Sequence, residues 1–138
     1  PPRSTLFPYT TLFRSAVPKT SAATIATANT SRTGSGTIGN IFTAGVNGSR
    51  IDKIVIHAQS TVTAGAIRFF IHDGTNYFLF KEMPVVATTP AATTPAFSAV
   101  LSQEIEAALP LILPTGYSLM AATEKAESFN IIAIGGDF

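Results

Sequence analysis

The sequence contains no cysteine and no tryptophan, and only 12% of its 138 residues are charged. The absence of cysteine excludes disulfide bonds and thiolate metal sites. No apolar run approaches the ~18 residues of a membrane span, so we expect no membrane partner. The hydrophobic residues, 46% of the chain, must therefore be buried in a core or against other subunits.

The first fifteen residues, PPRSTLFPYTTLFRS, have no sustained strand or helix periodicity. Read back into codons, they match in order one frame of the adapter oligonucleotide used in short-read sequencing. We therefore expect residues 1–15 to be a non-native, disordered segment rather than a genuine N-terminal arm, and residues 16–138 to form one domain. Leaving out Arg3 and Arg14 lowers the net charge from +1 to −1, which removes any argument for nucleic-acid binding.

Turn-forming stretches follow one another closely along the rest of the chain, and the segments between them are six to ten residues long. This spacing is typical of an antiparallel β-sandwich. We predict an all-β fold with a single sandwich, either jelly-roll or immunoglobulin-like, and the sequence leaves the strand order open. The turn-forming stretches are 31–36, 45–49, 73–76, 89–95, 113–116 and 123–128.

Alternating apolar residues predict several strands. The pattern in residues 50–59 and 66–72 is that of half-buried strands, and residues 66–82 should form a hairpin turning at DGTN. Residues 117–123 and 129–136 should form a second pair. Weaker strands are predicted at 22–28, 37–44, 84–87 and 97–101, and 102–113 as an irregular segment leading into an apolar edge strand. The repeat ATTPAATTP is either an extended loop or an arm that reaches a neighbouring subunit.

The residues that could carry chemistry are few. A hairpin turning near residues 63–65 would place His57 and His72 on one sheet face, but that face supplies no suitable third metal ligand. No GxSxG motif is present, SRTGSGTIGN lacks the ending of a phosphate-binding loop, and DGTN lacks the remaining ligands of a calcium loop. We therefore predict no catalytic, metal or cofactor-binding residues, and a protein that is not an enzyme. The sequence leaves open whether two carboxylates come together in space, as the catalytic pair of a glycosidase does.

Large apolar side chains occur on both faces of the segments FFIHD and YFLFKE. A two-layer sandwich buries only one face of each sheet, so the second set needs another cover, and self-association would supply it. We predict that the interface residues include Phe70, Phe78 and Phe80.

Three segments, FIHDGTN (70–76), LPTGYSL (113–119) and the ending FNIIAIGGDF, resemble a family of small proteins encoded among the structural genes of tailed phages and prophages. The resemblance extends over most of residues 50–138. It implies a virion structural protein, such as a capsid decoration or auxiliary head protein, made in the bacterial host cytoplasm. Its partners would be its own copies and the major capsid protein or other virion proteins.

The alternative is a receptor- or carbohydrate-binding module of a phage tail, which would be favoured if Tyr77, Tyr117 or Phe138 formed a flat exposed platform. The adapter-like start suits a gene assembled from bulk, metagenomic sequencing reads.

Overall fold

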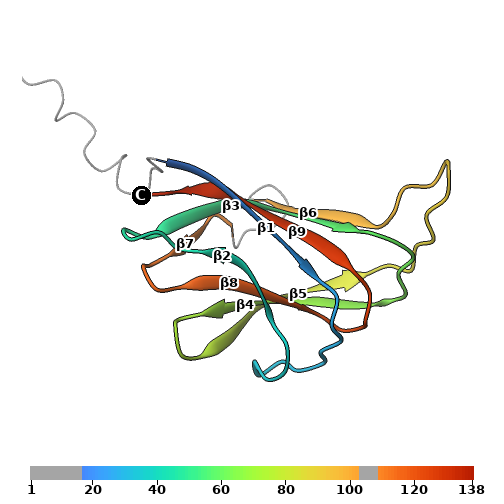
Figure 1. The fold of residues 1–138 in the computed structure, drawn as a ribbon, viewed down its shortest axis with the longest axis horizontal. Helices are drawn as coiled ribbons and strands as arrows, with labels where there is room; N and C mark the ends of the chain where they lie inside the picture. Colours follow the sequence, from blue (N-terminus) through green and yellow to red (C-terminus); the bar gives the residue numbers. More distant parts are fainter. Residues whose placement is uncertain (1–16, 103–108) are drawn as a thin grey trace, which may run out of the picture.

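The computed structural model describes residues 17–102 and 109–138, so the expectations for residues 1–15 fall outside it. The described elements are strands, arranged in two antiparallel sheets packed face to face (Figure 1). The predicted all-β sandwich is therefore confirmed. None of the described residues belongs to a helix that could cross a membrane. The strands are β1 Val17–Ile25, β2 Gly39–Thr43, β3 Ser49–Ala58, β4 Gly65–His72, β5 Tyr77–Val85, β6 Ser98–Ser102, β7 Leu111–Leu113, β8 Ser118–Thr123 and β9 Phe129–Asp137.

Each strand belongs to one of the two sheets, and the strand pairs enclose one another along the sequence. Sheet A has the order β1-β9-β3-β6, with the short β7 also paired to β3, and sheet B has the order β2-β8-β4-β5. The first strand thus pairs with the last, β2 with β8, β3 with β6 and β4 with β5. As a result, most connections carry the chain from one sheet to the other.

The core lies between the sheets and is built from alternate residues of each strand, as period-2 patterns require. In β3, Ile54 and Ile56 are fully buried, while Lys53 before them and His57 after them are exposed. Sheet B contributes Ile67 and Phe69 from β4, both at 0% exposure. Inward alternation therefore places the largest apolar side chains in one cluster between the layers.

The predicted hairpin at residues 66–82 is confirmed as β4 and β5. The segment 102–113 ends in an apolar strand, β7, as predicted, although residues 103–108 lie outside the described part of the chain. The predicted strand at 22–28 begins earlier, at Val17, and the one at 84–87 is the end of β5.

Two predicted pairings are wrong. Residues 117–123 form β8 in sheet B, whereas 129–136 fall in β9 of sheet A, so the two segments do not pair. The same holds for the strands of His57 and His72, because β3 is in sheet A and β4 in sheet B. Alternation identifies a strand, but it does not distinguish a turn that stays within a sheet from a connection that crosses between sheets.

The Thr-Pro repeat at residues 87–95 is a loop between β5 in sheet B and β6 in sheet A. It projects beyond the ends of the strands on the right of the view in Figure 1. Isolated bridges join Val62 to Thr88 at its base and Ala91 to Thr94 within it. The loop prediction is confirmed, and the arm stays a prediction.

Candidate functional site: the outer faces of the two sheets

The outer face of sheet B carries a second, smaller apolar cluster. Phe70 of β4 is 0% exposed and packs with Met120 and Ala122 of β8. Ile38 and Tyr77 complete the cluster, and the rings of Phe70 and Tyr77 meet edge to face with centroids 6.3 Å apart. A face that would otherwise be open to solvent is thus buried by residues of the same chain.

The segment that covers this cluster is the connection between β1 and β2, residues 26–38, here called the cover loop. The Asn29 N–H donates to the Thr123 carbonyl of β8 at 2.8 Å. The Asn29 side-chain amide donates to the carbonyls of Ser35 and Thr37, each at 2.9 Å. Asn29 therefore joins the start of the cover loop to β8 through its backbone and to the end of the same loop through its side chain.

Gly34 allows the close approach of the cover loop to sheet B. Its φ of +91° lies in the left-handed region that glycine adopts without strain. A Cβ at this position would lie 2.4 Å from the Tyr77 Cβ, so a larger residue would push the loop away. The glycine-rich stretch that the sequence indicated as a surface turn is therefore packed against the sheet.

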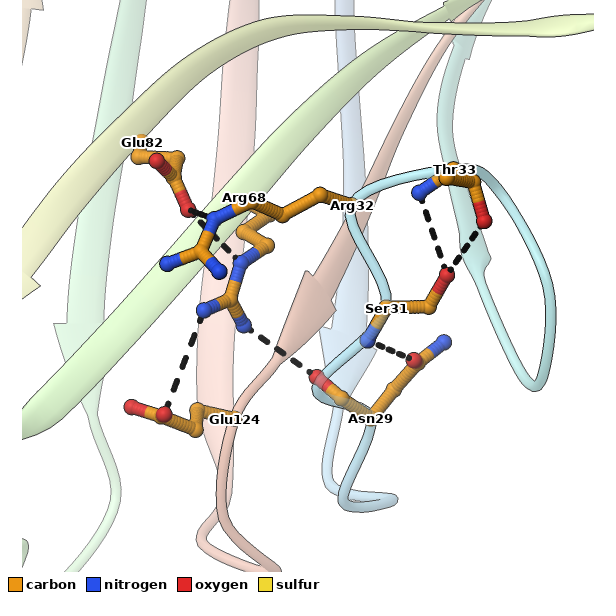
Figure 2. Close-up of polar contacts among 7 residues, drawn as sticks. All are labelled: Asn29, Ser31, Arg32, Thr33, Arg68, Glu82 and Glu124. Atoms are coloured by element: carbon orange, nitrogen blue, oxygen red, sulfur yellow. Dashed lines mark hydrogen bonds and ion pairs between the residues drawn. The ribbon is translucent and has the colours of Figure 1, made fainter.

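A buried arginine joins the cover loop to the sheet. Arg68 of β4 is 2% exposed, and its Nε donates to Glu82 Oε1 of the neighbouring β5 at 2.8 Å. Its Nη1 donates to the Asn29 carbonyl at 3.4 Å, and its Nη2 lies 3.9 Å from Glu124. Arg32 of the cover loop donates from Nε to the same Glu82 oxygen at 2.6 Å (Figure 2). Glu82 thus bridges loop and sheet.

The charges of this cluster stabilise the attachment of the cover loop to sheet B. The hydrogen bond from Arg32, followed by that from Arg68, lowers the pKa of the Glu82 carboxyl from its ordinary value. The carboxylate of Glu82 therefore stays ionised near neutral pH. The ionised Glu82 accepts hydrogen bonds from Arg32 of the cover loop and Arg68 of β4, so it holds the loop against sheet B.

The three phenylalanines predicted at an interface have different environments. Phe70 is fully buried under the cover loop, and Phe80 is partly buried against the main core. Phe78 is 55% exposed, and its neighbour Leu79 is 38% exposed. Within the chain, Phe78 is thus the one of the three rings that offers a large surface to a partner.

The outer face of sheet A is open by comparison. Register places Ala22 of β1 opposite Ile132 of β9, Ile132 opposite Val55 of β3, and Val55 opposite Val100 of β6. Because opposed residues share a face, these side chains form one row across four strands, here called the apolar row. Val100 is 39% exposed, and Ile134, on the same face, is 38% exposed. A shallow hollow of about 300 Å³ borders the row beside Ala22 and Ile132.

The two histidines do not meet, since they belong to different sheets. His57 is exposed, and its Nδ1 lies 2.9 Å from the Ala58 carbonyl. The His72 ring lies 4.3 Å from that of Tyr77. In the described ranges 17–102 and 109–138, no three His, Cys, Asp or Glu side chains gather as metal ligands would.

A serine near an acid and a lysine occurs at one end of the sandwich. Ser49 donates from Oγ to Asp137 and accepts a hydrogen bond from the Gly45 N–H at 2.8 Å, while Lys19 Nζ lies 3.3 Å from Asp137. The Ser49 hydrogen bond and then Lys19 lower the pKa of Asp137. Ser49 is 0% exposed, so its hydroxyl is closed to a substrate. This cluster ties the end of β9 to β1 and β3.

The DGTN segment forms the tight turn that the sequence predicted. Asp73 Oδ1 accepts hydrogen bonds from the N–H groups of Thr75 and Asn76, at 2.9 and 2.7 Å. These bonds, that from Asn76 foremost, lower the pKa of Asp73. The Asp73 carboxylate thus stabilises the turn between β4 and β5.

Comparison of the chain with protein-family models, curated proteins and solved structures found no match in any of the three.

Proposed function

We propose that the chain is a phage virion structural protein, a capsid decoration or auxiliary head protein that acts through contacts between its own copies and with the major capsid protein. The observation that carries the proposal is the apolar surface left open on both sheets, at Phe78 and Leu79 of β5 and along the apolar row of sheet A. Apolar side chains gathered on strands in this way are typical of surfaces that bind other proteins. The sequence resemblance to phage structural proteins supports the same assignment.

The proposal includes a jelly-roll type of sandwich. In a jelly roll, a long antiparallel hairpin is rolled up so that strands pair from the outside inward. The nested pairs β1–β9, β2–β8, β3–β6 and β4–β5 support this type. The immunoglobulin-like arrangement begins with two strands paired in one sheet, and β1 and β2 lie in different sheets here.

The mechanism we propose is mechanical. A protein that binds an assembled capsid lattice more tightly than free subunits stabilises the assembled state by mass action. Burial of the open apolar surfaces against the lattice would supply part of the binding free energy, at about 25 cal/mol per Å² of apolar area. No covalent step is involved, and the proposed role is not enzymatic.

The alternative of a carbohydrate-binding module receives less support from the aromatic residues. Tyr77 packs against His72 and Phe70, and Tyr117 packs against the main core. A flat platform would have to release these rings from their present contacts.

The test uses the full chain together with shells assembled from a tailed-phage major capsid protein whose gene is found beside the gene for this chain, once that neighbourhood has been sequenced. We expect the chain to sediment with the shells and to raise their thermal disruption temperature. A Val100→Asp/Ile134→Asp variant should bind at least about tenfold more weakly, because it places one charge on the apolar row and one beside it, whereas Thr75→Asp in an exposed turn should bind normally. A chain that ignores the shells but binds on a glycan array would contradict the proposal and favour the tail-module alternative.

A further inference from the structure

Strand β1 is an edge strand whose protection against pairing, Pro18 and Lys19, lies near its start, and its residues 20–25 carry neither a proline nor a charge. It is nine residues long and keeps an unbroken register with β9 from Val17 to Ile25. The other edges are shorter or interrupted: β2 and β6 have five residues each, and β2 contains a bulge. Strand β5 has a bulge and carries Lys81, Glu82 and Pro84. Bulges, charges and proline are the features that keep an edge from adding another strand.

Within the described residues, the side of β1 that faces away from β9 pairs with no other strand. Among residues 17–102 and 109–138, β9 is the one strand that pairs with β1. The single charged residue of β1 is Lys19, and its Nζ is held by the Thr43 carbonyl at 2.6 Å and by Asp137 at 3.3 Å. A second β1 approaching this edge would meet unpaired backbone groups and little electrostatic repulsion.

We propose that two copies of the chain pair through their β1 strands in antiparallel orientation. The two-fold axis lies midway between the two copies of Ser21. Opposed residues of an antiparallel pair share a sheet face, so a two-fold axis normal to the sheet must pass midway between the two copies of one residue. Ser21 is the centre of Val17–Ile25, and this choice places all nine residues opposite the second copy, although Pro18 has no N–H to donate. In this register Thr20 lies opposite Ala22 of the second copy.

The same register joins the apolar surfaces of the two copies. Ala22 lies beside Ile132 in sheet A, and Thr20 lies beside Ile134. Pairing Ala22 with Thr20 of the second copy therefore continues the apolar row of one molecule into Ile134 of the other. The two sheets become one sheet, in which the apolar row of each copy reaches Ile134 of the other. This inference deepens the proposed function by naming a contact between copies, and it rests on the self-association included there.

Cysteine cross-linking tests the register directly, because the chain contains no cysteine of its own. In the full chain, Ser21→Cys would face its own copy with Cα atoms about 4.5–5.5 Å apart, within disulfide range. We expect mild oxidation to give a disulfide-linked dimer. Thr24→Cys is the matched control on the same strand, because its two copies would lie six residues apart along the pair, about 20 Å. Equal cross-linking of both variants, or none of Ser21→Cys, would overturn the inference.

A charge pair gives a second test that leaves the fold alone, since Thr20 and Ala22 are both exposed. The variant T20K/A22K places lysines directly opposite each other, whereas T20K/A22E places lysine opposite glutamate. We expect sedimentation velocity to show dimer dissociation at about tenfold lower concentration for T20K/A22E than for T20K/A22K. Equal dimerisation of the two variants would refute the β1 contact.

The two proposals fail separately. A monomeric chain that still binds capsid shells would overturn the β1 dimer and leave the proposed function standing. A dimer cross-linked at Ser21 that does not bind the shells would overturn the proposed function and leave the dimer standing.

Discussion

On the outer face of sheet B, Phe70 and Arg68 are 0% and 2% exposed, whereas on the outer face of sheet A Val100 and Ile134 are 39% and 38% exposed. Both faces carry large apolar side chains on neighbouring strands. The difference comes from the β1–β2 connection, which crosses sheet B as the cover loop (Figure 1). The chain therefore supplies its own cover for one face, and the apolar row of the other is left for a partner.

The covered face also shows how a polar loop can cover an apolar cluster. The cover loop contributes one large apolar side chain, Ile38, and it is fastened to the sheet by hydrogen bonds of Asn29 and by the ion pair of Arg32. Burial of the Arg68 charge is tolerated because Glu82, Glu124 and a loop carbonyl surround it. A binding face, in contrast, would carry few buried charges and would keep its apolar groups accessible.

The largest effect we predict is the loss of Phe70 under the cover loop. Phe70→Ala should lower the free energy of unfolding by about 3–4 kcal/mol, because it leaves a cavity in a closed cluster. Phe78→Ala should lower it by less than about 1 kcal/mol, since that ring is 55% exposed. Urea denaturation of both variants measures the difference, and equal losses would mean that the cover loop does not bury Phe70.

Local patterns in the sequence predicted where the strands lie along the chain more accurately than which strands pair with each other. The alternation in β3 and β4 and the DGTN turn each depend on a few consecutive residues, so the strands and the first hairpin could be predicted. The pairing of β1 with β9 joins residues more than a hundred positions apart, and no short pattern encodes it. The connection from β3 to β4 contains an apolar residue, Val62, which the structure buries. An apolar residue at this position was a sign in the sequence that the segment is more than a tight turn.

The covered site could be predicted only in part. The need for a cover over Phe70 followed from apolar residues on both strand faces, but the cover was expected from a second copy. The cover loop reads as polar and glycine-rich, and its attachment depends on where Asn29 meets Thr123 and Arg68. The signal that could have indicated it is Arg68 itself, a charged residue between Ile67 and Phe69 in a strongly apolar strand.

The second prediction removes the buried arginine. Arg68→Ala should lower the free energy of unfolding by about 2 kcal/mol, because it leaves a cavity and removes the packing of the aliphatic stem. The loss is smaller than for many buried ion pairs, since Glu82 keeps Arg32 as a partner and is partly exposed. Lys53→Ala is the matched control, at an outward position of a central strand in sheet A, and it should change stability by less than about 0.5 kcal/mol.

Hydrogen exchange at the cover loop compares the same two variants, Arg68→Ala and Lys53→Ala, at a single backbone amide. In Arg68→Ala the backbone amide of Asn29, which donates to Thr123, should exchange faster because the loop has lost one of its fastenings. In Lys53→Ala it should exchange at the parent rate. Unchanged exchange in Arg68→Ala would show that Arg68 does not hold the cover loop.

The smallest effect we predict appears only on acidification. The pKa of Glu82 is lowered in the folded protein, chiefly by the Arg32 hydrogen bond, so its contribution to stability is present above the unfolded-state pKa and is lost as the pH falls below about 4.5. Glu82→Gln should therefore be less stable than the parent at pH 7, and the gap should narrow towards pH 3. Because Asp137 and Asp73 titrate in both proteins, their contributions cancel in this difference. Urea unfolding of the two proteins at pH 7, 5 and 3 measures the gap. A gap that stays constant with pH would mean that the carboxylate charge of Glu82 does not fasten the cover loop, and that the covered face of sheet B is held by its apolar contacts and by Asn29.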